Sequence, residues 1–69
     1  MDYRKLKGKI KEVFDTQDAF AKALGLSYTS LNFKINDKRD WTVSEIMKAC
    51  ELLNIQLSDA HLYFFNRKV

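Results

Sequence analysis

The chain has 69 residues, of which 46% are hydrophobic and 30% charged, and it contains one cysteine, one histidine and no proline. The single cysteine excludes an internal disulfide, and with one histidine it leaves no credible set of metal ligands. The longest apolar run, residues 62–65, is too short to cross a bilayer, and the charged first residues do not resemble a secretory signal. We therefore expect one small cytoplasmic domain covering residues 1–69, without a cofactor, and the size argues against an enzyme.

The net charge of +3 is unevenly distributed along the chain. Residues 1–11 carry five basic side chains and one acidic one, whereas residues 12–69 carry seven basic and eight acidic ones. A basic end on a nearly neutral body is typical of a protein that binds a polyanion such as nucleic acid. A lysine-rich helix face in contact with solvent has the same composition, so charge alone leaves both interpretations open.

The first predicted helix begins near Tyr3 and ends near Phe14. Its apolar residues recur at spacings of three and four, which is the period of an amphipathic helix; they are Leu6, Ile10, Val13 and Phe14. Asp2 can cap the start of this helix.

Two short helices joined by a tight turn are predicted next. Thr16 is a favourable N-cap for the first of them, and Gly25 supplies the left-handed residue that ends it. Ser27 is expected to cap the second, which runs from about residue 28 to residue 35. The pair Asn36-Asp37 ends that helix, since asparagine tolerates the left-handed conformation.

A fourth and a fifth helix complete the chain. Thr42 and Glu45 have the spacing of a capping box, and the fourth helix is expected to continue to Asn54. The last helix should span about residues 58–66, with Ser58 as its cap between the apolar residues Leu57 and Leu62. No segment alternates apolar and polar residues as a strand does, so we predict an all-α fold of five helices.

The helix pair between residues 17 and 36 resembles the helix-turn-helix of phage repressor and Cro-type (XRE-like) regulators. The resemblance rests on co-spaced residues, namely Gln17, Phe20, Ala21, Leu24, Gly25, Leu26, Ser27 and Leu31. It implies a compact five-helix lambda-repressor-like domain, and it is closest to small temperate-phage proteins of Cro-like or modulator-of-repression type.

This resemblance implies a regulator of the choice between lysogenic and lytic growth in a bacterial host cell. In the main hypothesis the protein binds double-stranded operator DNA as a Cro-like homodimer, with its third helix in the major groove. In the alternative hypothesis it is an antirepressor. It would then form a heterodimer with the lysogenic repressor and mask that repressor's DNA-binding helix.

The resemblance also assigns roles to individual residues of a DNA-binding or partner-binding surface. Gln17 and Ser27 correspond to residues that meet phosphates near helix N-termini. The residues expected to face base edges are Tyr28, Thr29, Asn32 and Phe33. Those expected to clamp the DNA backbone after the helix are Lys34, Asn36, Lys38 and Arg39.

Three residues depart from the pattern of the family. Tyr28 and Phe33 are aromatic where relatives usually carry polar or basic side chains, and Asp37 stands where glycine is common. Exposed aromatic residues desolvate base edges but supply few hydrogen bonds, and exposed apolar patches often mark protein interfaces. Asp37 places a negative charge beside the expected phosphate path. These departures are the reason for the antirepressor alternative, and operator binding remains the main hypothesis.

The apolar run near the C-terminus is the second candidate interface. Successive helical residues point about 100° apart, so adjacent aromatics cannot all face one core. A last helix that closes the core is one interpretation. The other, which we favour, is a dimer seam formed by Leu62, Tyr63, Phe64 and Phe65. Trp41 and Cys50 are expected in the core, and His61 is expected to make a local contact at a helix start.

Overall fold

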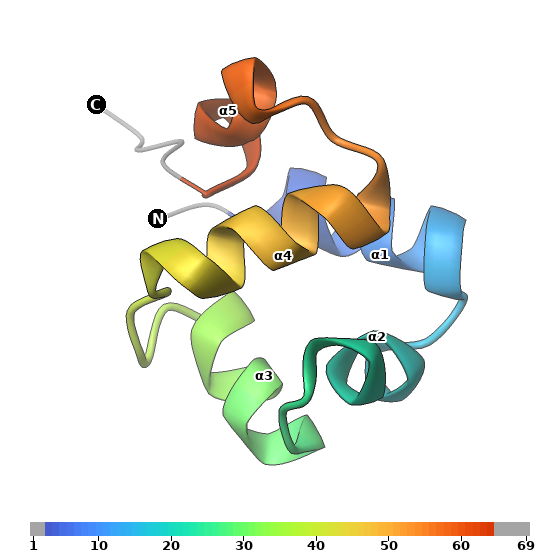
Figure 1. Cartoon of the computed structure of the whole chain (residues 1–69). Helices are drawn as coiled ribbons and strands as arrows, with labels where there is room; N and C mark the ends of the chain where they lie inside the picture. The colour runs from blue at the N-terminus through green and yellow to red at the C-terminus, as the bar shows by residue number, and fades with distance from the viewer. Residues whose placement is uncertain (1–2, 65–69) are drawn as a thin grey trace.

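The structure is a computed structural model that describes residues 3–64, and within this range it contains α-helices and one 3₁₀ turn but no strand (Figure 1). The elements are α1 (Arg4–Phe14), α2 (Gln17–Leu24), α3 (Tyr28–Ile35), α4 (Val43–Leu53), η1 (Leu57–Asp59) and α5 (Ala60–Phe64). The predicted all-α fold with five helices is confirmed. In Figure 1, α4 lies between α3 on one side and α5 on the other.

The predicted helix starts at Thr16, Ser27 and Thr42 are confirmed by side-chain hydrogen bonds. Thr16 Oγ1 accepts the Ala19 N–H at 3.1 Å, and Ser27 Oγ accepts the Ser30 N–H at 3.1 Å. The capping box before α4 is complete because Thr42 Oγ1 accepts the Glu45 N–H at 3.2 Å and Glu45 Oε1 accepts the Thr42 N–H at 2.9 Å. Each bond pairs a backbone donor that has no partner inside its helix.

Three helices end in the same way, on a residue in the left-handed conformation. These residues are Gly25 (φ 79°), Asp37 (φ 60°) and Asn54 (φ 57°). After each of them, the next backbone N–H donates to a carbonyl of the last helical turn, at 2.7–2.9 Å. The predicted end of α3 at Asn36-Asp37 is confirmed, but Asp37 and not the asparagine takes the left-handed conformation, since Asn36 has φ −110°.

The two ends of the chain differ from the prediction. Tyr3 occupies the N-cap position of α1 but its side chain does not cap the helix and is buried instead, while Asp2 lies outside the described residues. Ser58 was expected to cap the last helix but lies inside η1, and α5 begins at Ala60. Leu57 is 61% exposed and therefore does not form the predicted hydrophobic contact at this helix start. The predicted end near residue 66 also lies outside the described residues.

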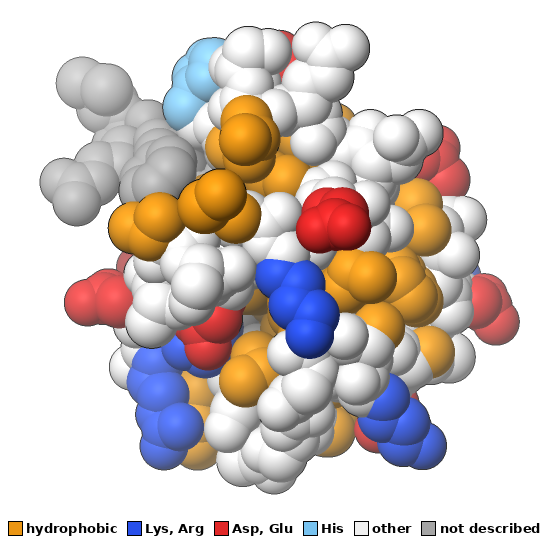
Figure 2. All heavy atoms as spheres, viewed as in Figure 1, with side chains coloured by type: hydrophobic (Ala, Val, Ile, Leu, Met, Phe, Trp, Pro, Cys, Tyr) orange, Lys and Arg blue, Asp and Glu red, His pale blue; other side chains and the backbone are white. Residues whose placement is uncertain are grey.

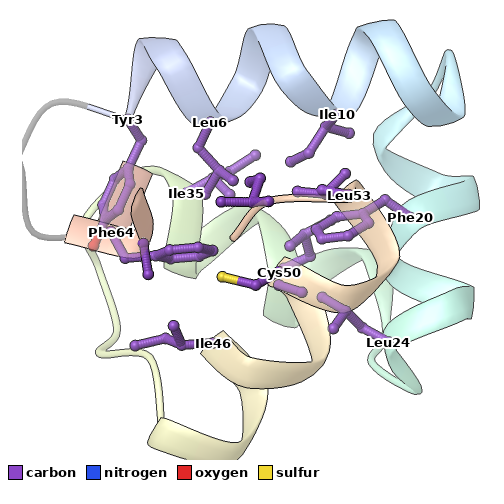
Figure 3. Packing of buried hydrophobic residues seen from close by; sticks show 14 of the residues in the cluster. Tyr3, Leu6, Ile10, Phe20, Leu24, Ile35, Ile46, Cys50, Leu53 and Phe64 are labelled. Atoms are coloured by element: carbon purple, nitrogen blue, oxygen red, sulfur yellow. The ribbon is translucent and has the colours of Figure 1, made fainter. Parts of the chain in front are cut away.

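The core lies where the five helices meet, and each helix contributes side chains to it (Figure 3). Val13 was expected to face inward but is 44% exposed, and Phe14 packs against Phe20 in its place, with 5.3 Å between ring centroids. Phe64 is 1% exposed and meets Trp41 edge to face at 5.0 Å. Phe64 was predicted to lie in a dimer seam. That prediction was wrong for this residue, because its ring fills the core beside Trp41.

Candidate functional site

The helix-turn-helix predicted from the sequence is formed by α2, the turn after it and α3. Gly25 turns the chain, and the Leu26 N–H donates to the Ala21 carbonyl at 2.9 Å. Ala21 is fully buried where α2 packs into the core, and Leu31 is the matching buried residue of α3. The turn sets the position of α3 next to α2, and Leu31 holds one side of α3 against the core. The opposite side of α3 is exposed.

Two aromatic side chains lie on the exposed side of α3. Tyr28 is 49% exposed and Phe33 is 37% exposed. Arg39, in the loop that follows α3, stacks over the Phe33 ring with its guanidinium carbon 4.9 Å from the ring centroid. Thr29 is also exposed, and Asn32 is half-buried. We call Tyr28, Thr29, Asn32, Phe33 and Arg39 the α3 face. It contains the four residues that the resemblance assigned to base edges, together with Arg39.

Lys34 does not clamp a ligand as the resemblance implied, because its side chain is turned inward. Lys34 is 7% exposed, and its Nζ donates to the Asp40 carbonyl at 2.9 Å. The same Nζ lies 3.0 Å from Glu45 Oε1 and 6.0 Å from the centre of the Trp41 ring. The ammonium group thus ties α3 to the loop and to the first turn of α4. A signal was present in the sequence, since Lys34 follows the buried Leu31 by three residues and so lies on the inward side of α3.

The remaining residues expected to contact phosphates are only partly free to do so. Asn36 accepts a hydrogen bond from Lys7 Nζ at 3.2 Å and donates to the Asn32 carbonyl at 2.8 Å. Ser27 is used as a helix cap, and Gln17 is half-buried at the start of α2. Lys38 is exposed next to Asp37.

Acidic groups surround the end of α3. Burial raises the pKa of Tyr3, and the nearby carboxylates of Asp37 and Asp40 raise it further. The loop of residues 36–40 contains two acidic and two basic side chains, so it has no net positive charge. The phosphate path expected from the resemblance therefore has less positive charge than a count of lysines and arginines suggests.

The basic segment at the start of the chain also has internal partners. Lys9 pairs with Glu12 at 2.9 Å, and Lys11 pairs with Asp15 at 3.1 Å. Lys5 lies over the ring of Tyr63 at 5.4 Å from the centroid. Exposed ion pairs of this kind are weak and are screened by salt. Three of the lysines of the basic segment therefore have partners within the chain.

Comparison with known proteins places these features in a family. The model of a family described as proteins of unknown function (DUF739) matches residues 1–67. The chain belongs to the DUF739 family. A search of curated proteins found no match.

A solved structure resembles this DUF739 chain closely. It is the solution structure of the modulator of repression (MOR) of the temperate bacteriophage TP901-1 from Lactococcus lactis. The two share 47% sequence identity with a TM-score of 0.84, over 99% of this chain and 92% of that chain. The similarity is to a small phage regulator, as the sequence suggested, and it lies at the modulator-of-repression end of the predicted range.

Among residues 3–64, the dimer seam predicted for this DUF739 protein is only partly exposed. Phe64 is in the core, Tyr63 is half-buried under Lys5, and Phe65 lies outside the described residues. Leu62, at 39% exposure, is the one member of the predicted dimer seam that is both described and exposed.

Cys50 and His61 have the surroundings that the sequence predicted. Residues 3–64 contain no group of three or more side chains that could hold a metal ion. Cys50 is buried, and burial raises the pKa of its thiol, as expected for a core residue. His61 Nδ1 lies 3.1 Å from the Ser58 carbonyl, the local contact that was predicted. No helix in this part of the chain is long and apolar enough to cross a membrane.

Proposed function

We propose that this DUF739 protein is a modulator of repression of a temperate phage, and that it binds the lysogenic repressor through the α3 face and masks the repressor's DNA-binding helix. The observation that carries the proposal is the exposure of Tyr28 and Phe33 on α3 in a chain 47% identical to a phage modulator of repression. Operator binding by α3 is the competing hypothesis.

The chemistry of the α3 face suits a protein partner. Aromatic residues and arginine are enriched where interfaces gain most of their binding energy. Arg39 stacks on Phe33, so the two side chains offer one flat amphipathic surface, and Tyr28 adds a ring with a hydroxyl group. Such rings bury a large apolar area with few rotatable bonds, which favours binding to another helix.

The electrostatics of α3 support the same choice. DNA binding depends on cations that neutralise phosphates. Lys34 is held by Glu45 and by the Asp40 carbonyl, and Asp37 lies next to Lys38 in the loop. A partner protein needs no excess of positive charge at these positions.

Masking would work by mass action. A repressor whose DNA-binding helix is covered cannot bind its operator, so the fraction of free operator rises with the concentration of the modulator. The proposed activity is binding alone and assigns no catalytic step to any residue.

The test measures binding of the same purified protein to operator DNA and to the lysogenic repressor. Fluorescence anisotropy with duplex DNA of the phage switch region, at several salt concentrations, reports direct DNA binding. Calorimetry with the purified lysogenic repressor reports the protein complex. We expect tight binding to the repressor, competition between this complex and the operator, and no operator preference of the modulator alone at low salt.

Matched variants identify the surface that binds. Phe33→Ala should weaken repressor binding about tenfold or more, as for the centre of an interface. Val13→Ala removes an apolar side chain of similar exposure, 44%, from α1 and should change binding little. The proposal would be wrong if the protein alone bound operator DNA with steep salt dependence, and if Lys38→Ala weakened that binding more than Phe33→Ala did.

A further inference from the structure

The backbone on both sides of Arg39 is bonded to α3. The Lys38 N–H donates to the Phe33 carbonyl at 2.7 Å, and the Asp40 carbonyl accepts from Lys34 Nζ at 2.9 Å. Phe33 and Lys34 are consecutive residues of α3, so the loop is held against one place on this helix. The Arg39 side chain therefore starts from a fixed point and reaches the Phe33 ring, with its guanidinium carbon 4.9 Å from the ring centroid.

The guanidinium group of Arg39 is oriented by this stacking and is exposed. Its N–H groups form no hydrogen bond or ion pair with residues 3–64. Stacking covers one face of the planar group and leaves the N–H groups along its edge open. In Figure 2, basic side chains lie against hydrophobic ones on the side of the molecule where Figure 1 shows the loop between α3 and α4. Arg39 thus presents a fork of donors at a defined place on the α3 face.

A partner that covers this guanidinium group must supply an anion. When an interface buries a charge, an opposite charge has to meet it, because desolvation otherwise costs more free energy than the contact returns. A carboxylate matches the edge of the guanidinium with two parallel hydrogen bonds, whereas a carbonyl oxygen leaves the positive charge unpaired. DNA phosphates would match it as well, but the exposed rings of Tyr28 and Phe33 on the same face favour a protein.

We infer that Arg39 is the specificity-determining residue of the α3 face and that it binds a carboxylate of the lysogenic repressor; this inference rests on the proposed function. A repressor without a carboxylate at that place would bind more weakly. Lys34 acts as a positioning residue, because it holds the Asp40 carbonyl and with it the loop that carries Arg39. Lys34 is itself fixed by Glu45 Oε1 on α4, at 3.0 Å.

The first test compares single substitutions by calorimetry with the purified lysogenic repressor. Arg39→Gln removes the charge and the fork and should weaken binding about tenfold or more. Arg39→Lys keeps the charge without the fork and should lie between Arg39→Gln and the wild type. Lys48→Gln, the control, removes the same charge from an exposed position on α4 and should change binding less than about twofold. Circular dichroism should show each variant to be folded, since both positions are exposed.

The second test identifies the carboxylate on the repressor. Arg39→Glu should abolish measurable binding, because it places two carboxylates against each other. Each exposed Asp and Glu of the repressor is then replaced by Arg in turn. One of these repressor variants should restore binding to the Arg39→Glu protein and should bind the wild-type protein poorly. A contact that only fills space would show no such reciprocal rescue.

The third test separates the positioning role of Lys34 from its effect on stability. In NMR spectra of the free protein, the ring current of Phe33 should shift the side-chain N–H signal of Arg39, and Phe33→Ala and Lys34→Met should each reduce this shift. At a temperature where it is folded, Lys34→Met should weaken repressor binding in the wild-type background but little in the Arg39→Gln background. Glu45→Gln is the milder second variant and should follow the same pattern. A merely structural role would weaken binding by the same factor in both backgrounds.

Four outcomes would overturn the inference. If Arg39→Gln bound the repressor as tightly as the wild type while Phe33→Ala did not, the proposed function would stand without a role for Arg39. If no repressor variant restored binding to Arg39→Glu, Arg39 would not meet a carboxylate. If the protein alone bound operator DNA with a salt dependence that Arg39→Gln reduced, Arg39 would contact a phosphate. If the wild-type protein bound neither partner, the proposed function and the inference would both be wrong.

Discussion

The Lys34 ammonium group lies 3.0 Å from Glu45 Oε1, the same oxygen that accepts the Thr42 N–H at the start of α4. One carboxylate oxygen thus completes a helix cap and holds a lysine of the neighbouring helix. Lys34 also donates to the Asp40 carbonyl in the loop between the two helices. The contact joins α3, the loop and α4, and it removes from the surface a cation that the helix-turn-helix pattern assigned to ligand binding.

Removal of the Lys34 charge should destabilise the protein. Lys34→Met keeps the length of the side chain but leaves Glu45 and the Asp40 carbonyl without this partner, and we expect a loss of about 1–3 kcal/mol in the free energy of unfolding. Lys38→Met, at an exposed position of the same loop, should change it by less than about 0.5 kcal/mol. Urea denaturation at neutral pH measures both. Equal losses would contradict the structural role of Lys34.

The Glu45 carboxylate should make stability depend on pH in the acid range. Burial alone raises its pKa, but the Thr42 N–H and the Lys34 ammonium outweigh burial, and the pKa is lowered from its ordinary value of 4.5. A lowered pKa in the folded state stabilises the protein above the ordinary value, and this contribution is lost as the pH falls through the lowered value.

Glu45→Gln should therefore unfold at lower urea concentration than the wild type at pH 7, and the difference should shrink as the pH falls through the lowered pKa of Glu45. In the Lys34→Met background the difference at pH 7 should be smaller, because the main cation is gone. If the difference in stability between the wild type and Glu45→Gln did not change with pH, the Glu45 carboxylate would not be the group that stabilises the fold.

Phe64 should behave as a core residue and Leu62 as a surface residue. Phe64→Ala removes a ring that is 1% exposed and meets Trp41, so it should lower the free energy of unfolding by about 3 kcal/mol. Leu62→Ala, at 39% exposure, should cost less than about 1 kcal/mol. Thermal denaturation compares the two variants. A Phe64→Ala variant that stayed as stable as the wild type but changed its oligomeric state would instead support the predicted dimer seam.

Cys50 should be protected from thiol reagents in the folded protein. It is 1% exposed, and burial raises the pKa of its thiol, so little thiolate is accessible. We expect its reaction with a chromogenic disulfide to be more than about 100-fold slower in buffer than in urea. Ser58→Cys in a Cys50→Ala background provides an exposed cysteine that should react rapidly in both. Rapid labelling of native Cys50 would indicate that α4 opens locally.

Features set by neighbouring residues in the chain were predicted well. The caps at Thr16, Ser27 and Thr42 depend on a hydroxyl group three residues before the N–H that it accepts, so the sequence alone locates them. Gly25 is also recognised from the sequence alone, because few other residues tolerate the left-handed conformation that ends α2. Ser58 has the composition of a cap but lies inside η1, and composition could not reveal that the chain turns there before α5 begins.

Features set by packing between helices were not predicted. Whether Phe64 or Tyr63 enters the core depends on the angle at which α5 meets α1 and α4, and no spacing within α5 determines that angle. Lys34 could be placed on the inward side of α3, but its partner Glu45 lies on another helix. The stacking of Arg39 on Phe33 likewise depends on the path of the loop, so the sequence named both residues without joining them.

Because Lys34 anchors α3 to α4, α3 meets a binding partner already ordered. Association then requires no folding step, and the loss of chain entropy on binding is confined to side chains of the α3 face. Calorimetry of such a complex would register a heat-capacity change set by the surface that the two proteins bury, without the larger change of a segment that folds as it binds.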